Sequence, residues 1–214
     1  MTLPTSGLIT VNDRGARAAT TFGSVAAVGG NMVFIKKLTA SSSGTLSFVD
    51  GASSVVLDNT YKEYLFILKD IHGSVNDRRL EFNVSIDSGS NYNVAKTSTA
   101  FEAYHYENNG AAAAGYVTSR DLAEGTGFQI LTSEAGADNE ECACGTIQLF
   151  NPASTTFVKH YISRMVDKNP APAAVVNHVA GYVNVTAAID AVQFKLDTNN
   201  IQSGIIKLYG IKDS

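Results

Sequence analysis

Clustered tyrosines are the side chains in this sequence whose type best suits ligand binding. Tyr104 and Tyr106 flank a single histidine, and Tyr92 lies a short distance before them. Tyrosine rings offer an apolar surface with a polar tip, which suits stacking on sugar rings, although core and interface packing uses them as well. We therefore name Tyr92, Tyr104 and Tyr106 as candidate ligand-binding residues for a glycan.

Carboxylates could do the chemistry of a glycan-cleaving enzyme. They crowd the middle third of the chain, at Glu102, Glu107, Asp121, Glu124, Glu134, Asp138, Glu140 and Glu141. Glycosidic cleavage needs two carboxyls about 5–10 Å apart, a separation that a sequence does not give, and a solvated acidic rim explains the same residues. The chain has no Gly-x-Ser-x-Gly elbow, P-loop or dinucleotide fingerprint. We predict a protein that is not an enzyme.

Metal ligands are the next possibility. The two cysteines, Cys142 and Cys144, are separated by one residue, which differs from the common zinc-binding pairs. We expect a strand here whose two thiols point to opposite faces, one inward and one to the surface, and therefore no disulfide between them. The four histidines stand alone in the sequence, at His72, His105, His160 and His178. We predict neither a zinc site nor a cofactor.

Calcium would need oxygen ligands from loops. Candidates are Asp50, Asp58, Asp87 and Asn91. No loop has the spacing and terminal Glu of an EF-hand, and Asp and Asn are frequent in turns for backbone reasons. We therefore predict no metal site.

Charge and hydropathy limit the partners. Charged residues make up 17% of the chain and the net charge is -4, which leaves no basic footprint for nucleic acid. No apolar stretch approaches the roughly 18 residues of a membrane span, and the N-terminus lacks a signal-peptide pattern. The absence of a disulfide framework fits production in a reducing cytosol. We expect neither nucleic acid nor membrane as a partner.

The element expected to position these groups is a central strand over residues 61–71. Its middle, residues 64–68, is the longest purely apolar run and is rich in aromatic and branched side chains. Five residues are too few for a buried helix but suit a strand that is covered on both faces.

Further short strands are expected before and after it, separated by turn residues. Their expected ranges are 32–38, 44–49, 54–57, 80–86, 92–96, 100–106, 116–118, 127–131, 143–150, 156–166, 175–185, 191–196 and 204–211. The four alanines at 111–114 are expected in a loop. Strands spaced without helices predict an all-β fold, an antiparallel β-sandwich that is jelly-roll-like.

Residues 1–30 differ from the sandwich domain expected at 31–214. Small residues dominate, and the apolar ones are too widely spaced to form a core, at Leu3, Pro4, Leu8, Ile9, Val11 and Phe22 among others. We expect an extended N-terminal arm, with one helical turn near 11–19, that binds a partner through those residues.

Several strand and turn segments resemble parts of known proteins, among them Leu149-Phe150-Asn151-Pro152. The segments are 39–48, 57–64, 87–94, 149–152, 158–164, 188–195 and 204–211. Together they span most of residues 39–212 and are similar to a widespread family of small virion proteins of tailed phages, especially aquatic ones. Residues 3–7 also resemble the start of many phage tail and head-surface proteins, where they mark an attachment arm. Residues 140–145, which contain the cysteines, and residues 14–31 depart from the pattern.

The resemblance implies a non-enzymatic structural component of a virion, assembled in the host cytoplasm, of the capsid decoration (cement) or tail-fibre type. Its partners would be major capsid or tail proteins, and its own copies would form a homo-oligomer, with a trimer favoured. A carbohydrate- or receptor-binding adhesin module of the phage tail is the alternative, because it shares the fold and differs only in its site.

Overall fold

The apolar run at 64–68 lies in β3 (Glu63–Gly73), an interior strand of the larger of two antiparallel sheets. The computed structural model describes residues 30–213, and these contain no helix, so none that could cross a membrane. The expected arm residues Leu3, Pro4, Leu8, Ile9, Val11 and Phe22 and the expected helical turn at 11–19 lie outside the described residues.

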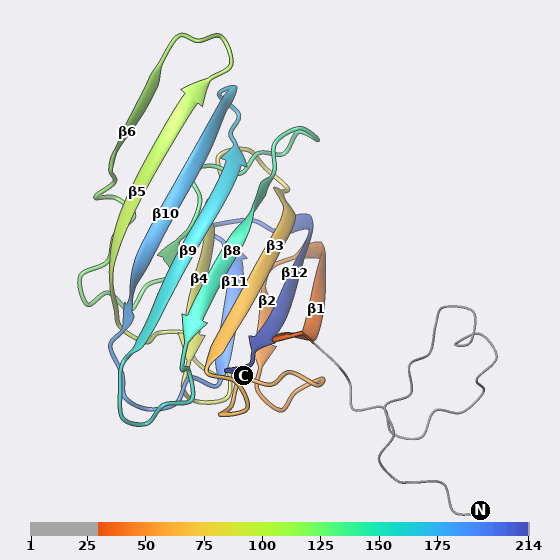
Figure 1. The fold of residues 1–214 in the computed structure, drawn as a ribbon. Helices are drawn as coiled ribbons and strands as arrows, with labels where there is room; N and C mark the ends of the chain where they lie inside the picture. The colour runs from red at the N-terminus through yellow and green to blue at the C-terminus, as the bar shows by residue number, and fades with distance from the viewer. Residues whose placement is uncertain (1–29, 214) are drawn as a thin grey trace, which may run out of the picture. The chain divides into compact units, whose positions relative to one another are not determined.

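The larger sheet has eight strands and the smaller one four. The order in the larger sheet is β1 (Met32–Ser43), β12 (Ile201–Ile211), β3, β8 (Ala143–Phe150), β9 (Lys159–Lys168), β10 (Ala173–Val183), β5 (Lys96–Tyr106) and β6 (Ala112–Tyr116). The order in the smaller sheet is β2 (Leu46–Val49), β11 (Ala191–Leu196), β4 (Leu80–Ser85) and β7 (Gln129–Ile130). Figure 1 shows the smaller sheet behind the larger one, against only part of its width. The all-β sandwich expected from the sequence is confirmed.

The strand order is that of a jelly roll with two additions. Without β5, β6, β9 and β10, two four-stranded sheets remain, β1-β12-β3-β8 and β2-β11-β4-β7. Successive strands of this set alternate between the two sheets, except for β4 and β7, which are neighbours in the smaller sheet, and the order is that of a double-sheet jelly roll. The four added strands extend the larger sheet beyond β8, in the order β9-β10-β5-β6 (Figure 1). We call these four strands the wing.

Aromatic side chains from both sheets fill the space between them. The Phe66 ring of β3 lies 5.4 Å from the ring of Phe48 on β2 and 5.4 Å from that of Phe194 on β11. Alternation along β3 buries Tyr64, Phe66 and Leu68 and leaves the residues between them half-buried. The expectation that β3 is covered on both faces was therefore wrong, since the smaller sheet covers its inner face and no described element covers its outer one.

Some expected strands are loops, and one expected loop is a strand. Residues 54–57 lie in a loop, because Ser53 and Ser54 have φ of 50° and 66° and the Gly51 amide donates a hydrogen bond to the Val55 carbonyl within that loop. Residues 92–95 precede a strand that begins at Lys96 and runs unbroken to Tyr106. The alanines at 112–114 lie in β6, because they pair with β5.

Candidate functional site

Tyr104 and Tyr106 line a cleft on the inner face of the wing. The cleft has a volume of about 300 Å³. The two rings meet edge to face, with centroids 5.7 Å apart. The other lining residues come from β5, β10 and the loops, and they are Glu102, Arg120, Ser133, Glu134, Asn169, Ala171, Ala173 and Val175. The alternation of β5 explains why the two tyrosines and Glu102 share this face.

The connection from β6 to β8 builds the rest of the cleft, because it crosses the inner face of the wing. The Val117 amide donates a hydrogen bond to the Ala100 carbonyl, and the Leu122 amide donates one to the Ser98 hydroxyl. These contacts bring Arg120 to the cleft, although it is far from Glu102 in sequence.

A chain of polar side chains runs from the cleft into the protein. Arg120 Nη1 lies 2.8 Å from Glu102 Oε2 and donates a second hydrogen bond, of 2.6 Å, to Asn177 Oδ1. Asn177 Nδ2 donates to Asp167 Oδ1 at 2.6 Å, and the Ser133 hydroxyl donates to the other Asp167 oxygen. Both Asn177 and Asp167 are buried. Five residues therefore form one connected network, which fixes the orientation of Glu102 and Arg120 in the cleft wall.

The electrostatics of this network are set by burial. Desolvation raises the pKa of the Asp167 carboxyl above its ordinary value, and the hydrogen bonds from Ser133 and Asn177 partly oppose that shift. Arg120 Nε and Asn169 Oδ1 are buried and have no hydrogen-bond partner within residues 30–213. Two adjacent tyrosine rings and a fixed pair of charged groups therefore line one cleft.

Tyr92, the third tyrosine that the sequence suggested, does not line the cleft. Its carbonyl accepts a hydrogen bond of 2.6 Å from Asn83 Nδ2, in the turn after β4. Asp87 in the same turn accepts hydrogen bonds from Asn91 and Ser85, which lower its pKa to about 2.

The other calcium candidates also stabilise turns. Asp50 accepts a bond from the Leu57 amide, and Asp58 accepts one from the Thr60 amide. Asp50, Asp58 and Asp87 thus all form hydrogen bonds within their own loops.

The outer face of the larger sheet is a second feature that could bind a partner. Residues opposite each other on neighbouring strands share a face, so the register defines rows across it. One row is apolar over five strands and consists of Cys144, Val166, Val176, Ala103 and Ala114. Five large apolar side chains on this face are between 46% and 55% exposed, and they are Phe34, Phe101, Tyr116, Ile162 and Val166. We call this surface the outer face.

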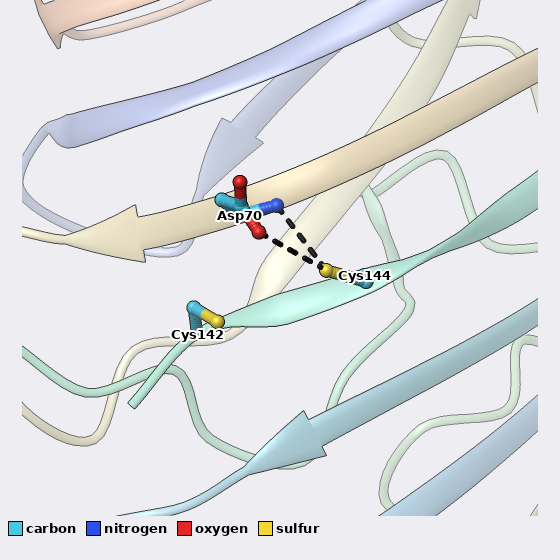
Figure 2. A group of neighbouring side chains, drawn as sticks. All are labelled: Asp70, Cys142 and Cys144. Atoms are coloured by element: carbon cyan, nitrogen blue, oxygen red, sulfur yellow. Dashed lines mark hydrogen bonds between the residues drawn. The ribbon is translucent and has the colours of Figure 1, made fainter. Parts of the chain in front are cut away.

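A thiol cluster lies at one end of the outer face. Figure 2 shows Cys142 and Cys144 at the start of β8, next to Asp70 of β3. One ligand atom from each of the three residues lies within 4.8 Å of the others. The expectation that the two thiols point to opposite faces was wrong, because residues separated by one position lie on the same face of a strand.

Both cysteines also border a hollow of about 410 Å³. The hollow extends across the outer face to His105 on β5. Three strand spacings of about 4.8 Å separate β8 from β5, so His105 lies too far away to join the cluster.

No family model, curated protein or solved structure matches this chain. The resemblance to phage virion proteins therefore stays an expectation, and the geometry of the cleft, the outer face and the thiol cluster is the basis for inferring a function. The structure brings together two of the three suggested tyrosines, and it adds Arg120, Asp167 and Asn177, which no local sequence pattern marks.

Proposed function

We propose that this chain is a non-enzymatic structural component of a tailed-phage virion, whose sandwich packs against neighbouring proteins through the outer face. The observation that carries this proposal is the outer face itself. Contiguous exposed apolar surface on a folded domain commonly marks a site of protein association. The jelly-roll order supports the proposal further, because viral capsid domains share it, although lectin domains do too.

In this proposal the chain forms a homotrimer through the outer face, and residues 1–30 attach the trimer to a capsid or tail protein. A closed ring of identical subunits would cover the apolar row on every copy. An extended segment that adds to a neighbour's sheet gains main-chain hydrogen bonds and would supply the attachment. Capsid decoration and tail fibre are both compatible with this arrangement.

Self-association is tested by a charge placed on the outer face. Ile162→Glu puts a carboxylate among exposed apolar side chains, while Ile86→Glu makes the same change at a residue outside that face that is 42% exposed. Light scattering on the full chain should give a trimer for the wild type and for Ile86→Glu, and a smaller species for Ile162→Glu. A wild-type chain that stays monomeric at high concentration would refute association through this face.

Virion membership is tested on particles. Purified particles of the phage that encodes the chain should carry gold-labelled antibody against it, on the head for a decoration protein or on the tail for a fibre. A variant lacking residues 1–30 should remain folded and be lost from the particles. Unlabelled particles would refute the proposal, and normal incorporation of the truncated variant would refute the anchoring role of the arm.

A second candidate function is recognition of a host surface carbohydrate, and the tyrosine cleft is the observation that favours it. Tyr104→Ala or Tyr106→Ala should then abolish binding on a glycan array, while Tyr182→Ala should not. Tyr182 is a matched control, because it is a partly exposed tyrosine on the opposite face of the wing. An array on which the wild-type chain binds no glycan would count against this function.

A further inference from the structure

We propose that Asp70, Cys142 and Cys144 bind a thiophilic divalent cation, with Zn²⁺ as the biological ion, through two thiolates and one carboxylate oxygen. The proposal is independent of the virion role, and it assigns a site where the sequence alone predicted none. A pair of thiolates selects soft or borderline ions such as Zn²⁺ over the oxygen-seeking Mg²⁺ and Ca²⁺.

The geometry of the cluster is close to that of a bound ion. Cys144 Sγ lies 3.7 Å from Asp70 Oδ1. A sulfur and an oxygen on one tetrahedral zinc are about 3.5 Å apart, from bond lengths near 2.3 and 2.0 Å. The ligand atom of Cys142 is within 4.8 Å of both partners, and two sulfurs on zinc are about 3.8 Å apart. Small movements of the three side chains would complete a three-ligand site, with the fourth position left for water.

The ionisation of the thiols sets the charge of the cluster. Partial burial, with the nearby charges of Cys144 and Asp70 as smaller causes, raises the pKa of the Cys142 thiol. A divalent ion reverses this, since it stabilises the deprotonated thiols that it binds. The Asp70 amide donates a hydrogen bond of 3.2 Å to Cys144 Sγ. Lys69 pairs with Asp70 Oδ2 at 3.4 Å, so it leaves Oδ1 directed toward the thiol (Figure 2).

The cluster lies where the pairing of two strands is interrupted. The register of β3 and β8 shifts between Leu68 and Ile71, and Asp70 has a φ of 52° in that interval. The Asp70 amide bonds to a thiol instead of a backbone carbonyl of β8. A bound ion would therefore join β3 to β8 where their ladder is irregular, and it would stabilise the pairing at this end of the two strands.

The full chain titrated with Cd²⁺ under reducing conditions tests the proposal. The cluster contains both cysteines of the chain, so a thiolate-to-metal charge-transfer band reports this site. We expect one Cd²⁺ per chain, displaced by Zn²⁺, and no band in Cys142→Ser or Cys144→Ser. Asp70→Asn should weaken binding by more than about ten-fold, a loss that even an outer-shell substitution can cause.

Asp77→Asn is the matched control, because Asp77 is also an exposed aspartate with a positive φ, 61°. It should bind as the wild type does. Zn²⁺ should also raise the melting temperature of the wild type and not that of Cys144→Ser. The proposal is overturned if the wild type gives no band at equimolar Cd²⁺, or if Asp70→Asn binds as tightly as Asp77→Asn, which would show capture by two thiols alone.

Discussion

The side-chain oxygen of Asn177 accepts a hydrogen bond of 2.6 Å from Arg120 Nη1, and this contact joins the cleft to the interior. On one side Arg120 pairs with Glu102 in the cleft wall. On the other side Asn177 donates to the buried carboxylate of Asp167. The orientation of the cleft's charged groups thus depends on residues that a ligand would not touch.

Replacing Arg120 by methionine should destabilise the protein by about 2–3 kcal/mol, because Glu102 and Asn177 lose their shared donor. Loss of one partner from a fully buried ion pair costs about 3–5 kcal/mol. We expect a smaller cost here because the Arg120 and Glu102 side chains are 11% and 24% exposed. Urea unfolding measures the change. Arg164→Met, at an exposed position on the outer face, should alter stability by no more than about 0.5 kcal/mol. Equal losses in the two variants would show that the network contributes nothing.

Phe66→Ala should cost about 3–5 kcal/mol, as expected for a large buried aromatic residue. The ring is fully buried and meets Phe48 and Phe194 edge to face. Phe157 is 68% exposed, so Phe157→Ala serves as the control and should change the unfolding free energy little. A cost below about 1 kcal/mol for Phe66→Ala would contradict its place at the centre of the sandwich.

Stability should rise with pH from about 8 to about 10 because of Lys96. This lysine is fully buried, and burial lowers its pKa to about 8. The unfolded lysine has a pKa near 10.4, so in this range the unfolded chain binds more protons and the native state gains about 1–2 kcal/mol. Above about pH 10 the trend reverses, because burial raises the pKa of Tyr64 and Tyr161 and only the unfolded tyrosines ionise.

Urea unfolding of the wild type and of Lys96→Met across this pH range measures the effect of Lys96. Subtracting the unfolding free energies of the two proteins at each pH removes the contribution of Cys142, whose raised pKa lowers stability as the pH rises. Parallel curves for the two proteins would show that Lys96 does not titrate in the folded state.

Gly145→Ala should destabilise the protein by about 1–3 kcal/mol, the usual range for overpacking. A Cβ atom at Gly145 would clash with the Arg164 carbonyl oxygen, so backbone atoms of β8 or β9 would have to move. Gly115 is also a strand glycine, and a Cβ there would meet nothing within 4 Å. Thermal unfolding should therefore give a lower melting temperature for Gly145→Ala than for Gly115→Ala. Similar melting temperatures would show that β9 can move without loss of stability.

Period-two patterning made the sandwich predictable from the sequence. Strands such as β4, β8 and β11 were expected within about a residue of their observed bounds, because alternating or continuous apolar residues end at clear turn signals. Strand β6 was missed because its exposed alanines and glycine carry neither β propensity nor alternation. Only its pairing with β5 makes it a strand.

The candidate sites were predictable only in part. Tyr104 and Tyr106 could be named because alternate positions of one strand place them together. Arg120 and Asn177 meet through segments that are distant in sequence, and no local pattern encodes such a meeting. The thiol cluster depends on Asp70, which faces Cys144 through an irregularity in the β3–β8 ladder that cannot be read from residue types.

The wing also has a consequence for the order of folding. Hairpins β5–β6 and β9–β10 each close locally. The wing forms only when β10 pairs with β5, and these two strands belong to additions that are far apart in the sequence. Closing that long loop carries an entropic cost that local hairpins avoid. Because the cleft has walls from both additions, we expect it to be completed late in folding, after the two halves of the wing have met.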